Sequence, residues 1–186
     1  MHEYRIRAIL NKTRLRNGLQ RYLNIMENLH KIDVSENAAF NVMYNGFYKI
    51  RQRPQEFYND FYAYMQFHKT NAGLSFSNVL NHFFERFERI EASFSSKLLA
   101  TINPNQPVWD IHVLNYLGLR RPVSNCRTEK YQRTLNIYCQ IEEKYKCFLQ
   151  SNDCKNWIKI FDEVFPQVKI STTKKVDLII WGNGIE

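Results

Sequence analysis

Apolar side chains recur every three or four residues along most of the chain, and this spacing sets what the chain can fold into. It corresponds to one face of an α-helix and leaves the opposite face to polar side chains. Glycine and proline number only 6 and 5 among 186 residues, fewer turn residues than an all-β fold usually needs. The sequence therefore predicts an all-α fold. Its first apolar stripe consists of Leu15, Leu19, Tyr22, Leu23, Met26 and Leu29.

Capping and helix-breaking residues divide the rest of the chain into further helices. The segment Asp33-Val-Ser-Glu36 fits a capping box, Pro54 is a favoured first helical residue, and Asp110 is a good N-cap. The apolar run 172–181 has the length of a helix or a buried strand, and we favour a helix because the chain offers no partner strand. The helices that we expect cover residues 33–50, 54–73, 75–90, 95–102, 110–118, 128–150, 153–165 and 172–181.

The chain has the length of one domain, with its first part as a helical extension. We expect residues 1–32 to form an N-terminal helix that packs on, or extends, a helical domain over residues 33–186. Arg7, Arg14 and Arg21 recur every seven residues on a second face of that N-terminal helix. This face is either an ordinary solvated surface or an edge that contacts phosphates.

The formal net charge of +8 and the sequence pI of about 9.3 favour a polyanionic partner, either nucleic acid or an anionic membrane surface. The alternative is that the charge serves only solubility. No apolar run approaches the roughly 18–20 residues of a membrane span, and the N-terminal segment lacks the apolar core of a signal peptide. We therefore expect a cytoplasmic protein that does not enter a membrane.

The four cysteines match no known ligand spacing for zinc or an iron–sulfur cluster, since the gaps between them are 13, 8 and 7 residues. We expect no metal, no metal cluster and no cofactor. Several of the cysteines fall on helical apolar patterns, and the cytosol disfavours disulfides, so we predict reduced thiols in the core. The residues are Cys126, Cys139, Cys147 and Cys154.

The most informative stretch runs from Ser95 to Arg121. It contains a short apolar helix, a proline-bearing loop, the run Pro107-Val-Trp-Asp110-Ile-His112-Val113, and then Leu117-Gly118-Leu119. In this order and spacing the chain resembles the helix-hairpin-helix DNA glycosylase superfamily, of the 8-oxoguanine and endonuclease type, as a divergent small bacterial-type member. The resemblance implies a multi-helix glycosylase-like domain with a degenerate helix-hairpin-helix.

The same resemblance implies roles for two residues, Asp110 and Lys97. A carboxylate beside C1′ stabilises the positive charge that develops on the sugar as a base is cleaved, and it activates the nucleophile. An amine with a lowered pKa attacks C1′ and forms a Schiff base, which adds a lyase activity. Asp110 would be the carboxylate and Lys97 the amine. The implied function is excision of a damaged or modified base from double-stranded DNA, as in base excision repair.

The resemblance also implies DNA contacts. The target base must leave the duplex and stack in a pocket, for which Trp109 is a candidate. The family hairpin usually contains glycines, whereas the matching stretch here, residues 92–96, has none, so phosphate contact would use the hydroxyls of Ser95 and Ser96. Basic side chains near helix ends either contact phosphates or complement helix dipoles. The candidates are His112, Arg51, Arg53, Lys69, Arg120 and Arg121.

Each of these assignments has a structural alternative. Asp110 serves equally as a plain helix cap, Lys97 as a solvated surface lysine, and Trp109 as a core aromatic. At the level of function, the alternatives are a catalytically inactive DNA-binding module of the same fold, which the missing glycines favour, and a protein-interaction domain in phage defence. The sequence leaves open the base, the source of the DNA and the oligomeric state.

Overall fold

The computed structural model describes residues 1–185, which form ten α-helices and no β-strand. The predicted all-α class is confirmed for these residues. None of the described helices is long and apolar enough to cross a bilayer. The helices are α1 (Glu3–Leu10), α2 (Thr13–Leu29), α3 (Ala38–Tyr48), α4 (Gln55–His68), α5 (Phe76–Phe87), α6 (Ala92–Ile102), α7 (Ile111–Tyr116), α8 (Arg127–Leu149), α9 (Asn152–Val164) and α10 (Thr172–Asn183).

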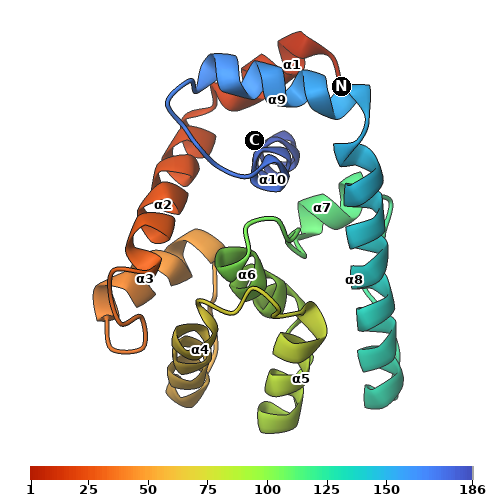
Figure 1. Cartoon of the computed structure of the whole chain (residues 1–186). Helices are drawn as coiled ribbons and strands as arrows, with labels where there is room; N and C mark the ends of the chain where they lie inside the picture. The colour runs from red at the N-terminus through yellow and green to blue at the C-terminus, as the bar shows by residue number, and fades with distance from the viewer. Residues whose placement is uncertain (186) are drawn as a thin grey trace.

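The last helix, α10, lies inside the molecule with other helices around it (Figure 1). In Figure 1, α1 and α9 run above it, α2 lies on one side, and α7 and α8 lie on the other. All eight residues from 173 to 180 are buried, so α10 has no solvent face over two turns. The prediction of a helix here is confirmed. Its N-cap is Ser171, whose hydroxyl accepts a hydrogen bond from the Lys174 amide at 3.1 Å.

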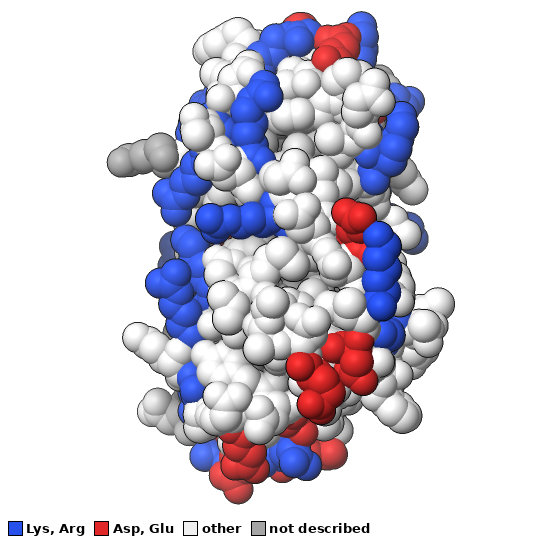
Figure 2. Space-filling view, turned by 90° about the vertical axis from the view of Figure 1, so that its left-hand side faces the viewer, with Lys and Arg blue, Asp and Glu red and all other residues white. Residues whose placement is uncertain are grey.

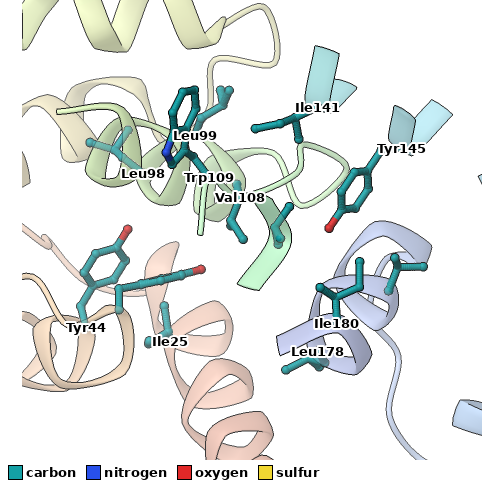
Figure 3. Close-up of a cluster of buried hydrophobic side chains, with 14 of the residues drawn as sticks. Ile25, Tyr44, Leu98, Leu99, Val108, Trp109, Ile141, Tyr145, Leu178 and Ile180 are labelled. Atoms are coloured by element: carbon teal, nitrogen blue, oxygen red, sulfur yellow. The ribbon is translucent and has the colours of Figure 1, made fainter. Parts of the chain in front are cut away.

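The core is built largely from aromatic rings on α3, α4 and α5. Phe57 and Phe61 of α4 lie 5.2 and 5.7 Å, centroid to centroid, from Phe83 of α5. The ring of Tyr44 of α3 lies 5.8 Å from that of Phe61, centroid to centroid, and is tilted by 54° to it. Figure 3 shows that this core continues, through side chains of α2, α6 and α8, to the buried faces of α10. One continuous core therefore joins the N-terminal and C-terminal helices.

Helices α5 and α6 form a hairpin whose turn, residues 88–91, is held by ion pairs. Glu88 adopts a left-handed conformation with φ of 53°. The Arg53 guanidinium donates to both carboxylate oxygens of Glu91, at 2.8 and 2.9 Å, and Arg89 donates to one of them at 2.8 Å. Because Glu91 is buried, these charge-assisted hydrogen bonds fix the turn.

Several helix boundaries differ from the predictions, among them the end of α4, which lies at His68 and not near Gly73. The N-terminal helix is two helices, because Lys12 is extended and separates α1 from α2. The second helix begins at Ala38 and not at Asp33 or Ser35, because Asn37 is the cap, and its side chain accepts from the Phe40 amide at 2.9 Å. Helix α6 begins at Ala92, three residues before its predicted start at Ser95.

The predicted core location of the cysteines is wrong for three of the four. Cys154 is buried, whereas Cys126, Cys139 and Cys147 are exposed. Helix α8 buries only one face, which carries Tyr138 among others. Cys139 is the next residue along and points away from that face, and Cys126 precedes the helix altogether.

Two glycine-to-alanine substitutions, one in α10 and one in α3, are predicted to change the free energy of unfolding in opposite directions. A Cβ on Gly182 would lie 2.5 Å from Leu15 Cδ1 and 2.6 Å from Ile9 Cγ2, both in the core. We expect Gly182→Ala to lower the free energy of unfolding by about 1–3 kcal/mol. Gly46→Ala in α3 meets no atom within 4 Å and should raise it by about 0.5–1 kcal/mol, because alanine is the better helix former. Urea titration of both variants measures the difference, and equal effects would contradict the tight packing.

Candidate functional site: a basic cleft beside α10

A cleft of about 700 Å³ opens between α2, the C-terminal end of α3, α6, the start of α7, and α10. Six lysine and arginine side chains line it, against two aspartates, so the cleft favours an anionic ligand. Its volume lies within the range of small-ligand pockets. The charged lining residues are Arg14, Arg21, Lys49, Arg51, Lys97, Asp110, Lys174 and Asp177.

Lys97 lies on α6 and reaches the cleft with only 9% of its surface exposed. Its ammonium donates a hydrogen bond to the carbonyl oxygen of Tyr48 at 2.9 Å. Burial lowers the pKa of Lys97 to about 8; the Asp110 carboxylate opposes this shift, and Lys49 adds to it. A substantial fraction of the amine is therefore neutral near physiological pH, which an exposed lysine would not provide.

Asp110 is the N-cap of α7, and one of its carboxylate oxygens accepts from the His112 amide at 2.9 Å. It is half-buried and lines the same cleft as Lys97. The capping role suggested as an alternative is therefore present, and it also fixes the carboxylate at the cleft. The fold thus brings Lys97 and Asp110, the two residues that the sequence motif predicts to be catalytic, to one cleft. Lys97 lies in the helix before the loop 103–110, and Asp110 lies at the end of that loop.

Two further charged residues of the cleft, Lys174 and Asp177, come from α10 and had no predicted role. The Lys174 ammonium lies over the Tyr22 ring, 4.5 Å from its centroid. One oxygen of Asp177 accepts a hydrogen bond from the Tyr145 hydroxyl, which points toward α10 in Figure 3. The other oxygen is buried and has no hydrogen-bond partner among residues 1–185. Burial raises the pKa of Asp177 to about 6, and Lys174 opposes the shift. Charged residues inside an apolar run were the sequence signal for this pair.

Three predicted contacts are corrected, because their side chains do not reach the solvent. Ser95 and Ser96 are fully buried, and the Ser96 hydroxyl accepts from the Trp109 amide at 2.8 Å. The early start of α6 places both serines inside the helix, so neither can contact a phosphate. Trp109 is only 3% exposed and lies parallel to the Phe76 ring at 6.4 Å, so it is a core aromatic and not a base-stacking residue.

The predicted basic contacts separate into two groups. Arg51 and His112 line the cleft, and Arg120 and Arg121 are exposed after α7. Arg53 and Lys69 instead hold the fold. Arg53 donates hydrogen bonds to the Glu91 carboxylate, and Lys69 donates one to the carbonyl of Ile32 at 2.9 Å.

Further basic residues complete the rim of the cleft. Arg14 and Arg21 project from α2, and Lys49 follows α3. Figure 2 shows the face on the α2 side, where lysine and arginine form a band along one edge while acidic side chains gather toward the bottom. These two arginines belong to the seven-residue repeat predicted from the sequence; its first member, Arg7, lies on α1 and pairs with Glu3 and Glu163 away from the cleft.

No protein-family model matches the chain, and neither a curated protein nor a solved structure does so. The chemistry of the cleft is therefore inferred from its own residues. A buried amine with a lowered pKa beside a carboxylate is suited to nucleophilic attack on an electrophilic carbon, and the cationic rim is suited to a phosphate-bearing substrate.

The buried amine makes stability depend on pH. Below pH 8 the folded protein bears the full penalty of a buried charge. Between pH 8 and the ordinary value of 10.5 the unfolded chain binds a proton that the folded one does not, so stability rises with pH. This difference between the folded and unfolded pKa of Lys97 corresponds to about 3 kcal/mol in the free energy of unfolding. Lys97→Met removes this penalty and loses one hydrogen bond worth about 1 kcal/mol, so we expect a gain of about 2 kcal/mol at pH 7.

Urea titrations of wild type and Lys97→Met at several pH values test this. The stability difference should shrink as the pH rises from 8 to 10. A variant that is less stable than wild type at pH 7, with no pH-dependent difference, would contradict a penalty at this position.

Proposed function

We propose that this protein is a DNA glycosylase with an associated lyase activity, in which Lys97 is the nucleophile and Asp110 the essential carboxylate. The observation that carries the proposal is that the buried Lys97 amine and the Asp110 carboxylate line one cleft with a cationic rim. The fold class, the residue chemistry and the resemblance of residues 95–121 support the same activity.

The reaction follows from the two groups. The neutral amine of Lys97 attacks C1′ of the target nucleotide as the glycosidic bond breaks, and the base leaves with the bonding electrons and takes up a proton. Asp110 stabilises the positive charge on the sugar and accepts the proton that the amine releases. Opening of the sugar ring at C1′ gives an iminium between C1′ and Nζ. Loss of a C2′ proton then expels the 3′ phosphate with its electron pair and cleaves the strand.

The arrangement of helices supports this proposal. Helices α5 and α6 form a hairpin, α6 carries Lys97, and a proline-bearing loop then leads to Asp110 at the start of α7 (Figure 1). This is the order that the resemblance to helix-hairpin-helix glycosylases implies. The turn at residues 88–91 lacks glycine, so its amides approach a phosphate less closely than those of a glycine-containing hairpin. We propose that the rim arginines of α2 supply phosphate contacts instead.

Borohydride trapping on an end-labelled duplex with one abasic site tests the nucleophile. Wild type should form a covalent adduct, because borohydride reduces the iminium to a stable amine. Lys97→Gln should form none. Lys175→Gln is the matched control, since Lys175 is a buried lysine that does not line the cleft. Its adduct should equal that of wild type, and an adduct retained in Lys97→Gln would assign the chemistry to another amine.

Asp110→Asn separates base release from capping. Asparagine caps helices as well as aspartate does, so the thermal midpoint should change little. Base release should fall about 10²–10⁴-fold, because the variant lacks the charge that stabilises the sugar cation. The measurement is release from duplexes that each carry one oxidised, deaminated or alkylated base. Unchanged release from the preferred substrate would remove Asp110 from the mechanism.

A catalytically inactive DNA-binding module is the second candidate. One observation favours it: the Lys97 ammonium already has a backbone partner, the Tyr48 carbonyl. On this alternative the lysine fixes α6 against the end of α3 and the cleft only binds. The trapping experiment decides between the candidates, because the module binds the abasic duplex without forming an adduct.

A further inference from the structure

Two buried lysines from different helices meet at one tyrosine of the cleft. Lys97 of α6 donates to the Tyr48 carbonyl at 2.9 Å. Lys174 of α10 places its ammonium 5.6 Å from the centroid of the Tyr48 ring. Both side chains line the cleft, and they are only 9% and 6% exposed. Both ammonium groups therefore contact Tyr48, one at its backbone carbonyl and the other at its ring.

The Lys174 ammonium is held by aromatic rings. The ring centroids of Tyr22, Phe47 and Tyr48 lie 4.5, 5.5 and 5.6 Å from Nζ, and within residues 1–185 its contacts are with these faces and not with a hydrogen-bond acceptor. Ring faces attract a cation without neutralising it. The adjacent Lys175 differs, because its ammonium forms an ion pair at 2.5 Å with Asp162, outside the cleft.

We propose that Lys174 is a positioning residue: three aromatic rings fix its ammonium at the cleft, where its charge disfavours protonation of the Lys97 amine. The inference rests on the proposed function for its purpose, since a glycosylase that forms a Schiff base needs a free amine. Lys174 itself touches no reacting atom. Its effect on the reaction passes entirely through Lys97.

Several other groups face Lys97 and have to be weighed against Lys174. Burial makes the largest contribution to the lowered pKa of Lys97. The Asp110 carboxylate raises this pKa. The nearby cations lower it further, and they are Lys49, Lys174 and Arg121. Lys49 and Arg121 are exposed, so solvent and salt screen their charges. Lys174 is buried, so its charge acts through a medium of lower dielectric and is screened less.

Asp177 is the acidic neighbour of Lys174 on α10, three residues along the helix. Its carboxylate is directed to the Tyr145 hydroxyl, which donates to one of its oxygens. Burial raises the pKa of Asp177 to about 6, so this carboxylate is neutral more often than an exposed one near that pH. Near pH 8, where the Lys97 amine titrates, this carboxylate is ionised and offsets part of the Lys174 charge, whereas the rings are the direct contacts of the ammonium.

The test measures the Lys97 amine directly and needs no DNA. Reductive methylation with ¹³C-formaldehyde labels the lysine amines for NMR. The methyl resonance that is missing from the spectrum of Lys97→Arg is that of Lys97. The chemical shift of this resonance is then followed against pH. The wild-type midpoint should lie near 8. Lys174→Met should raise it by about half a pH unit or more, the effect of removing one like charge across a desolvated gap. Lys174→Arg keeps the charge and should retain the wild-type midpoint.

Lys175→Met is the control for a merely structural effect, because it changes the neighbouring buried lysine and should leave the Lys97 midpoint unchanged. A wild-type midpoint in folded Lys174→Met, or equal shifts in the methionine and arginine variants, would overturn the proposal. The proposed function fails separately: without an adduct on the abasic duplex there is no glycosylase-lyase chemistry, whatever the midpoints. With an adduct, its pH profile should move together with the Lys97 midpoint in Lys174→Met.

Discussion

The burial of α10 is the constraint from which most of the structure follows. Eight consecutive residues of this helix are buried, and three of them carry charge. An isolated charge in a protein interior is costly, so each needs a partner from a surrounding helix. Lys175 pairs with Asp162 of α9, Asp177 accepts from Tyr145 of α8, and Lys174 contacts rings of α2 and α3. The surrounding helices thus supply chemically different partners to one central helix.

The same arrangement holds the loop 103–110 and with it Asp110. The Ser171 hydroxyl at the start of α10 donates to the Pro104 carbonyl, and the Tyr138 hydroxyl donates to the Pro107 carbonyl at 2.9 Å. The Trp109 amide donates to Ser96 of α6. The loop is therefore tied to α6, α8 and α10 before it reaches Asp110. A carboxylate on such a loop has a fixed position, which electrostatic stabilisation of a developing charge requires.

Sequence reasoning succeeded where the information is local. Periodicity predicts the helices, and the loop with its aspartate predicts a cap at Asp110, because both depend on residues within a few positions. The predicted phosphate contacts of Ser95 and Ser96 were wrong, because helix α6 starts three residues earlier than predicted and places both side chains in the core. Sequence reasoning gave no role to Lys174, because the rings that surround it come from α2 and α3, more than 120 residues earlier in the chain. Only the tertiary fold brings them together.

The position of Lys97 is better explained by function than by stability. An apolar residue of similar length would fill the space between α6 and α3 without the penalty of a buried ammonium, and one hydrogen bond to the Tyr48 carbonyl offsets only part of that penalty. The Asp110 carboxylate reduces this cost, and the cations Lys49, Lys174 and Arg121 increase it. A site selected for stability alone would have replaced this lysine or given it a carboxylate in direct contact. A buried amine with a lowered pKa is the condition under which lysine is a nucleophile, and this is why we propose that the chemistry takes place at this residue.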